Sequence, residues 1–428
     1  MSGRPIPHNR FYNDFDCQFF SPRKGEDYRT PFQRDRDRII YSSALRRLQA
    51  KTQVFLSGEY DFYRTRLTHS IEVAQIGRSI CHSLRQKGEP LGEDFFVDPD
   101  LVEAICLSHD LGHPPFGHSG EETLNELMTG FGGFEGNAHT LRMLTEIIYP
   151  DGPGRTGMKP TRALMDGVLK YKTRYSDHPD QPPQRHFVYD DQQRYLDFVF
   201  DGRPFPPELT PGKARNAFRS VECQIMDWAD DSAYSLNDIL DGVNARFITR
   251  ERLEKWGEEQ SLGGDSAVWV SEVLRKIHSG NLEKSFSSKI GDFIAACRTV
   301  PRENFMSDLS NRYAFCLEID PSVRAEAALY KKMASDIVFN SPQLQQLRYK
   351  WNNILRQLFE ALRDNYLGED QPIKLLSDIH HQRVVNAASE TEKMRELCDY
   401  VARMTDRFVL RAYRRLFDPG FGSILDFV

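Results

Sequence analysis

The stretch Leu107-Ser-His-Asp-Leu-Gly-His-Pro-Pro-Phe-Gly-His-Ser-Gly-Glu121 places three imidazoles and two carboxylates within fifteen residues. Glycines and prolines separate them, which restricts the backbone to turns and helix ends. A lone His-Asp pair would be weak evidence, since a helix often ends in a histidine and a turn aspartate. Here further imidazoles follow directly, and together these groups can bind a divalent metal, position a phosphate and transfer protons. The stretch therefore indicates metal-dependent chemistry on a phosphate.

A further histidine, His69, lies about forty residues upstream and follows Arg64 and Arg66. By itself such a histidine is more often a hydrogen-bonded core residue than a metal ligand. Two neighbouring guanidinium groups favour the ligand interpretation, because guanidinium binds phosphate oxygens in a bidentate manner.

Three polar residues, Asp230, Tyr234 and Asp238, recur at four-residue intervals downstream and would share one face of a helix. A solvated face is the alternative interpretation. The apolar stripe beside them, which includes Ile225 and Ala233, favours a helix edge that faces a polar pocket, since buried carboxylates need partners.

Helical periodicity runs through most of the chain, without an internal repeat. Asp98 followed by Pro99 predicts a helix start, with the helix running to His109. Ser119 with Glu122 predicts a capping box that begins the next helix. Further helices are expected over about 32–48, 67–84, 137–148, 161–171, 220–240 with Gly242 as its stop, 249–257, 265–279, 283–299, 323–338, 341–366 and 389–417, with a short strand at 312–319.

The domain organisation predicted from this pattern is all-α. Residues 1–28 form an N-terminal arm, and residues 29–245 form the catalytic core. Periodicity disappears between about 172 and 215, which predicts an irregular insertion in that core. Residues 246–428 form a helical C-terminal region that packs on the core and completes the site.

The composition is that of a globular protein, because 28% of residues are charged and 39% are hydrophobic. The net charge of −6 will not attract polyphosphates, so local cations or a metal must do so. No run of eighteen apolar residues and no apolar secretory segment is present, so we expect no membrane association and a cytoplasmic location. Seven cysteines without a CxxC pair predict buried thiols rather than disulfides.

The order His69, His109-Asp110, Asp230 resembles the metal signature of the HD superfamily of metal-dependent phosphohydrolases. Further segments between about 29 and 410 make the chain similar to the bacterial dGTPase-like deoxynucleoside triphosphate triphosphohydrolases. These segments are Arg46-Arg-Leu-Gln-Ala-Lys-Thr-Gln-Val-Phe55, Arg64-Thr-Arg-Leu-Thr-His-Ser70, Gly133-Phe-Glu-Gly-Asn-Ala138, Leu169-Lys-Tyr171, Ala229-Asp-Asp-Ser-Ala-Tyr234 and Met404-Thr-Asp-Arg407.

This resemblance implies an HD-domain helical fold and hydrolysis of a dGTP-like deoxynucleoside triphosphate. Water would attack the α-phosphorus and release deoxynucleoside and inorganic tripolyphosphate. The residues implied are His69, His109, Asp110 and Asp230 for the metal; His118, Glu121 and His113 for catalysis; Arg66, Lys170 and Tyr171 for the phosphates; Gln53 for the sugar or base; and Tyr234 and Asp238 for the deoxyribose.

The chain departs from the family pattern at two places. His139 stands where the family often has Gln, and Lys-Thr-Arg-Tyr follows Tyr171 where the family usually has a proline. The second departure leaves open which Lys or Arg completes the phosphate-binding set.

The implied cofactor is a divalent metal ion. Carboxylates suit Mg²⁺ or Mn²⁺, whereas imidazoles favour Mn²⁺, Fe²⁺ and other transition ions, so Co, Ni and Zn are also compatible. The implied partners are a deoxynucleoside triphosphate, further copies of the chain in a tetramer or hexamer, and a single-stranded DNA effector. Apolar C-terminal helices would supply the oligomer interfaces.

Two other functions fit the same residues. The first is another HD phosphohydrolase, either a 5′-nucleotidase or a guanosine tetraphosphate hydrolase. The second is a catalytically silent regulator that binds nucleotides or single-stranded nucleic acid through the basic runs at 34–38 and 411–415. Aspartates alternate with the arginines of the first run, which favours a self-paired helix face.

Overall fold

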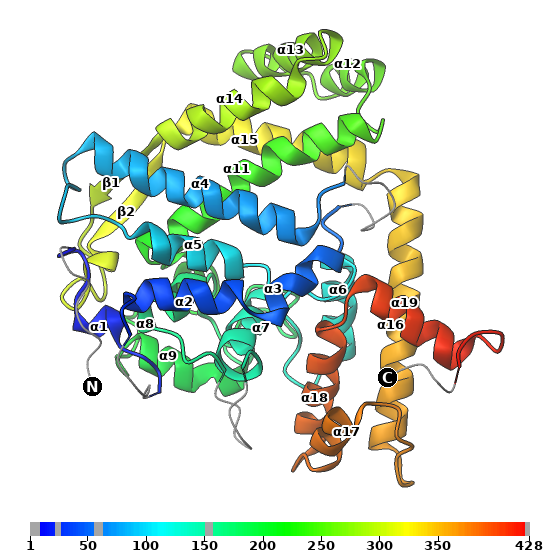
Figure 1. Cartoon of the computed structure of the whole chain (residues 1–428). Coiled ribbons are helices and arrows are strands. Elements are labelled where there is room, and N and C mark those ends of the chain that lie inside the picture. Colours follow the sequence, from blue (N-terminus) through cyan, green and yellow to red (C-terminus); the bar gives the residue numbers. More distant parts are fainter. Residues whose placement is uncertain (1–8, 22–26, 55–62, 150–156, 424–428) are drawn as a thin grey trace.

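Three helices, α4 (Arg66–Lys87), α5 (Pro99–Ser108) and α11 (Val221–Asn244), pack against one another at the centre of the larger hydrophobic core (Figure 1). The computed structural model describes residues 9–21, 27–54, 63–149 and 157–423. Within these ranges the fold is helical apart from one two-stranded antiparallel sheet. The predicted all-α class is therefore confirmed.

Local sequence signals fix where α4 and α5 begin. Thr65 caps α4 by accepting from the backbone N–H of Thr68, which puts His69 in the first turn. The carboxylate of Asp98 accepts from the N–H groups of Asp100 and Leu101 at the start of α5, as its sequence predicts. The capped start of α4 carries His69, and His109 directly follows the last residue of α5, so both imidazoles lie on or beside a helix.

The capping box predicted at Ser119 is wrong. Helix α6 (Gly117–Leu127) begins two residues earlier, after Phe116 adopts a left-handed conformation with φ 65°. The hydroxyl of Ser119 instead hydrogen-bonds to Asn352 of helix α16 (Pro342–Leu367). The start of α6 is thus set by a tertiary contact and a turn, not by a local cap.

A second hydrophobic core joins α6 to the C-terminal region. Side chains of α6, including Leu124 and Met128, pack with Leu355 and Leu358 of α16 and with Leu397 of α18 (Glu390–Ala402). Figure 1 shows α16 and α18 beside α6, at the edge of the central helices. This packing brings the C-terminal region to the chemistry-bearing stretch.

Several predicted boundaries are corrected by the structure. Helix α11 continues through Gly242 to Asn244, because Gly242 packs closely against Ile248 and Val338 instead of ending the helix. Residues 297–301 form strand β1 (Cys297–Pro301), paired with β2 (Phe315–Ile319), where a helix was expected to continue to 299. The predicted helix over 389–417 is two helices, α18 and α19 (Asp406–Phe417), separated by the cap Thr405.

The remaining helices occur largely where periodicity predicts them, but α17 was not expected, and α1, α9 and α10 lie in the segments predicted to be an N-terminal arm and an irregular insertion. They are α1 (Asp14–Cys17), α2 (Pro31–Ile40), α3 (Ser43–Arg47), α7 (Gly136–Arg142), α8 (Arg162–Val168), α9 (Gln193–Val199), α10 (Lys213–Ala217), α12 (Arg250–Glu259), α13 (Asp265–His278), α14 (Leu282–Ala295), α15 (Pro321–Ala334) and α17 (Asp378–Val385). Short 3-10 or π turns are Leu48–Ala50, Met143–Ile147, Asp190–Gln192, Asn311–Tyr313 and Ser335–Phe339.

The described part of the predicted N-terminal arm lies against the core. Phe11 is buried, and the hydroxyl of Tyr12 donates to Glu222. The seven cysteines are free thiols, and all but Cys316 are buried, as predicted. No helix in the described ranges is sufficiently long and apolar to cross a bilayer.

Candidate metal and phosphate site

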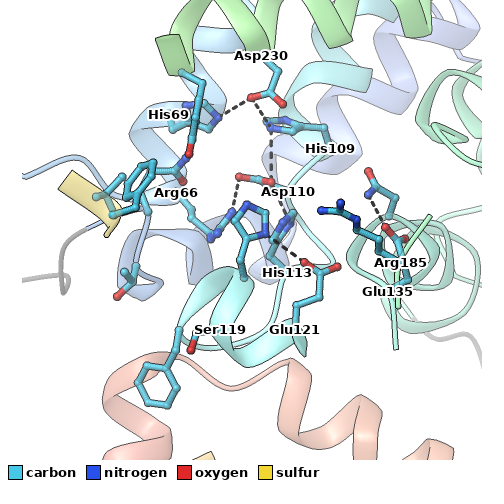
Figure 2. A pocket seen from close by; sticks show the side chains of 18 of the residues that line it. Arg66, His69, His109, Asp110, His113, Ser119, Glu121, Glu135, Arg185 and Asp230 are labelled. Atoms are coloured by element: carbon cyan, nitrogen blue, oxygen red, sulfur yellow. Dashed lines mark hydrogen bonds and ion pairs between the residues drawn. The ribbon is translucent and has the colours of Figure 1, made fainter. Parts of the chain in front are cut away.

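Residues from α4, α5 and α11 converge on one point, although they lie far apart in the chain (Figure 2). His69 Nε2 lies 3.1 Å from Asp230 Oδ1, and His109 Nε2 lies 3.7 Å from the same oxygen. His109 Nε2 is also 3.5 Å from Asp110 Oδ1. Donor atoms of His69, His109 and Asp110 all lie within 4.8 Å of one another. The four residues predicted as metal ligands are therefore brought together.

The imidazole of His109 is oriented toward this point by a backbone contact. Its Nδ1 lies 2.6 Å from the carbonyl oxygen of Cys106, which can only accept, so Nδ1 carries the hydrogen. Nε2 then offers its lone pair to the cluster, where it is buried and has no hydrogen-bond partner among the described residues. A buried lone pair beside two carboxylates fits a divalent cation, and the donor set is one that such ions accept.

The surrounding charges and hydrogen bonds favour the ionised form of both carboxylates in the cluster. Burial would raise the pKa of Asp110, but His113 and Arg66 hold it well below its usual range. The pKa of Asp230 is also lowered against the effect of burial, mainly through the hydrogen bond with His69. Ionised carboxylates are the state that a cation requires.

A second group, made of His113, His118 and Glu121, adjoins the first. His113 Nδ1 lies 2.9 Å from Asp110 Oδ1, and the rings of His113 and His118 have centroids 5.6 Å apart. Glu121 approaches His118 Nδ1 at 3.3 Å and accepts from the N–H of Gly136 at 2.6 Å. The His118 side chain is 71% exposed, whereas that of Glu121 is only 18% exposed. A partly buried carboxylate thus orients an accessible imidazole.

The two arginines that flank His69 have different environments. Arg66 is buried in the site and donates to Asp110 Oδ2 at 2.7 Å. A β-carbon at Gly117 would lie 2.8 Å from Arg66 Nη2, so glycine is needed where this guanidinium passes. Arg64 instead forms ion pairs with Glu72 and Asp241. Of the two arginines, only Arg66 lines the pocket that surrounds the site.

A pocket of about 440 Å³ surrounds both groups. Its lining comes from the HD-like motifs, from the irregular insertion and from the C-terminal region. Besides the metal and catalytic candidates, it includes Gln53, Val54, Glu135, Asn137, Lys170, Tyr171, Arg185, His186, Tyr234, Phe339, Asn340, Leu344, Arg348 and Trp351.

Two of the predicted phosphate-facing residues, Lys170 and Tyr171, line this pocket just after α8. Lys170 Nζ lies 2.5 Å from Asp227 Oδ1. Burial disfavours its charge, but Asp227 raises the pKa of Lys170 above its ordinary value, so the ammonium is retained. The ring of Tyr171 packs against His186 with centroids 4.5 Å apart.

Arg185 is a pocket residue that the sequence analysis missed. It forms no ion pair or hydrogen bond with any described residue, and Figure 2 shows it directed toward the cluster from the side opposite Arg66. Its backbone is held in place, because Asn125 donates to the Gln184 carbonyl at 3.0 Å and Asn216 donates to that of His186 at 2.7 Å. The only sequence signal was an arginine in an aperiodic segment.

The three predicted sugar- or base-facing residues differ in their placement. Gln53 and Tyr234 line the pocket, and Gln53 Oε1 is buried without a hydrogen-bond partner in the described structure. Asp238 is one helical turn beyond Tyr234 and does not line the pocket. It is 4% exposed, and burial with the nearby charge of Asp241 raises its pKa well above the usual value. Only the first two meet the cavity directly.

Comparisons with known proteins agree with this arrangement. Residues 66–233 match the HD domain, and residues 317–415 match the phosphohydrolase-associated domain. The chain is 34% identical to a deoxyguanosinetriphosphate triphosphohydrolase-like protein of Shewanella sediminis, over 94% of this chain and 96% of that protein. It is 35% identical to deoxyguanosinetriphosphate triphosphohydrolase-like protein 2 of Deinococcus radiodurans, over 94% and 95% of the two chains.

Proposed function

The chain belongs to the deoxyguanosinetriphosphate triphosphohydrolase-like family of HD phosphohydrolases, and from this premise we propose that it hydrolyses deoxynucleoside triphosphates such as dGTP. The products are the deoxynucleoside and inorganic tripolyphosphate, formed by attack of water at the α-phosphorus. The observation that carries this proposal is the convergence of His69, His109, Asp110 and Asp230 in a pocket whose lining also includes Lys170 and Arg185.

The four clustered residues would hold a divalent ion, with Mn²⁺ or Mg²⁺ as our first expectation and Fe, Co, Ni or Zn as alternatives. Such an ion would polarise a phosphate oxygen and lower the pKa of water. The chain's own residues bind and orient the substrate around it. Arg66, Lys170 and Arg185 neutralise the triphosphate, which carries about four negative charges that repel an incoming nucleophile.

His118 is the proposed general acid/base or nucleophile-positioning group, with Glu121 holding its ring. Its exposed imidazole and partly buried carboxylate support this role, because proton transfer needs an accessible nitrogen in a fixed orientation. His113, whose Nδ1 lies 2.9 Å from Asp110 Oδ1, is proposed to contact the phosphates.

Selection of the deoxyribose is proposed to depend on Tyr234, whose ring would occupy the space of a 2′-hydroxyl. The predicted contact of Asp238 with the 3′-hydroxyl is not part of this proposal, because Asp238 is buried outside the pocket lining. Gln53, with its unpartnered carbonyl oxygen at the pocket wall, is proposed to bind the sugar or base.

Product analysis tests the proposal against the other HD phosphohydrolases. The purified protein is incubated with each deoxynucleoside triphosphate and Mn²⁺, and products are separated by anion exchange. Tripolyphosphate supports the proposal. Monophosphate from a nucleotide would indicate a 5′-nucleotidase, and pyrophosphate from guanosine tetraphosphate would indicate a tetraphosphate hydrolase.

A silent nucleic-acid-binding regulator is the weaker candidate. In the first basic run, Arg36 pairs with Asp37 and Asp100, and Arg34 pairs with Asp27. One of these ion pairs lies within the run and two reach Asp27 and Asp100 outside it, so Arg34 and Arg36 are engaged by carboxylates, which disfavours a phosphate-binding strip. Binding of single-stranded DNA that is lost above roughly 0.2 M salt would favour the regulator or an effector site.

We also propose that the chain assembles as a tetramer or hexamer through its C-terminal helices. Sedimentation of the purified protein tests this proposal, and a monomer would contradict it.

A further inference from the structure

We propose that Asp406, in the first turn of α19, is a positioning residue that holds two segments of the active-site lining in register. This inference rests on the proposed function for its catalytic readout. Asp406 lies in the C-terminal region and is 0% exposed. It reaches neither the metal cluster nor the pocket surface, so it would act through the segments it binds.

Both carboxylate oxygens of Asp406 are engaged by backbone or hydroxyl donors. Oδ1 accepts from the N–H of Phe116 at 2.9 Å. Oδ2 accepts from the N–H of Thr52 at 2.7 Å and from its hydroxyl at 2.5 Å. The cap of α19 is Thr405, which accepts from Phe408 N–H. Asp406 is therefore directed at other segments and is not needed as the side-chain cap of its own helix.

The Phe116 contact bears on the catalytic histidine. Phe116 has φ 65°, a conformation that a residue with a β-carbon adopts only when its surroundings hold it there. Asp406 accepts from the backbone N–H of Phe116. The ring of Trp351 stacks on the Phe116 ring, with centroids 5.4 Å apart and an interplanar angle of 4°. His118 follows two residues later. Loss of the Asp406 contact would release the turn that orients this imidazole.

The Thr52 contact bears on a second, neighbouring segment of the pocket lining. Thr52 directly precedes Gln53, whose carbonyl oxygen meets the pocket. The neighbouring Lys51 is buried and donates to the carbonyls of His113 at 2.5 Å and Ala402 at 3.0 Å. We call residues 113–118, which lead to His118, the catalytic turn. Lys51 links this turn to Ala402 at the end of α18, and Thr52 shares with it the carboxylate of Asp406 at the start of α19. Asp406 is the acceptor common to both segments.

The variant Asp406→Asn tests whether Asp406 positions the active-site segments or contributes only to the folding stability of the protein. An amide has one acceptor oxygen, so if that oxygen keeps the two Thr52 donors, its NH₂ group faces the Phe116 N–H. We expect kcat per metal-loaded, folded enzyme to fall about tenfold, with KM within about twofold, because a displaced catalytic group lowers the rate of the chemical step. Metal content should equal that of the wild type.

A matched control is Asp399→Asn on α18. Asp399 is also buried, but its carboxylate binds Arg142 Nε at 2.9 Å, whereas that of Asp406 binds the N–H groups of Phe116 and Thr52. We expect it to lower Tm while leaving kcat per folded enzyme unchanged. An Asp406→Asn enzyme that likewise keeps the wild-type kcat would overturn the proposal.

Two further measurements keep the inference testable. Thr52→Val removes the hydroxyl contact, and we expect KM to rise about threefold with kcat nearly unchanged. Unchanged values of both KM and kcat would count against a positioning role.

The fluorescence of Trp351 should change in Asp406→Asn, and the difference from the wild type should disappear when both proteins also carry Trp351→Phe. That spectroscopic result needs no turnover, so it separates failure of this inference from failure of the proposed substrate.

Discussion

The metal cluster and the rest of the pocket wall are built in different ways. The cluster comes from α4, α11 and the C-terminal end of α5 in the main core, where the capped start of α4 and the buried helix faces fix the side chains. The remaining wall comes from the irregular insertion, with Arg185, and from α16, with Arg348 and Trp351. The difference indicates that metal retention and substrate binding can be altered separately.

The largest expected effect is on the cluster. Asp230→Ala removes the carboxylate that approaches both His69 and His109, so we expect loss of bound metal and a fall in kcat/KM of roughly a thousandfold or more, equivalent to about 4 kcal/mol of transition-state stabilisation. Elemental analysis and activity assays measure both. Chelation of the wild-type protein should reproduce the loss, and added Mn²⁺ should restore it. A variant that keeps its metal and its rate would mean that the cluster is not the metal site.

The second effect should leave the metal in place. His118→Ala removes the exposed imidazole and not a cluster ligand, so we expect kcat to fall by about 10²–10⁴-fold at wild-type metal content. Glu121→Gln should lower kcat less, since it only weakens the orientation of the ring. A His118→Ala enzyme with a near wild-type rate would exclude the proposed role.

The third effect belongs to the insertion side of the wall. Arg185→Ala should raise KM for a deoxynucleoside triphosphate by about tenfold with little change in metal content, because a charge-assisted hydrogen bond to phosphate is lost. Arg174→Ala is the matched control, since Arg174 lies in the same insertion but pairs with Asp177. Equal KM values in the two variants would show that Arg185 does not bind the substrate phosphates.

The smallest effect concerns sugar choice. Tyr234→Ala opens space at the pocket wall, so the preference for dGTP over GTP should fall. We expect a fall of about tenfold, because one steric or hydrophobic contact typically contributes that much discrimination. The ratio of the two kcat/KM values measures this. A variant that still rejects GTP would show that another group excludes the 2′-hydroxyl.

The same contrast explains what the sequence could predict. His69, His109, Asp110 and Asp230 were predictable because each lies in a short motif on or at the end of a strongly periodic helix. The start of α6 was mispredicted at Ser119, because the left-handed turn at Phe116 depends on Trp351 and Asp406, which lie far away in the chain. Local capping rules do not contain that information.

The wall residues were missed for related reasons. Arg185 lies where periodicity disappears, and its direction depends on side chains of α6 and α10 that bind the backbone around it. Arg348 and Trp351 belong to an ordinary amphipathic helix, and only the packing of α16 against α6 brings them to the cavity. Strand β1 was missed because its five residues extend an apparently helical segment.

The unequal exposure of the site histidines has a chemical consequence. His69, His109 and His113 are buried, whereas the ring of His118 stands at the mouth of the cavity. An acylating reagent that attacks imidazole nitrogens would therefore reach His118 well before the other three. His186 is also exposed and lines the cavity, so the modified histidine has to be identified by mass spectrometry. Acylation of His118, slowed when nucleotide fills the cavity, would allow intact active sites to be titrated.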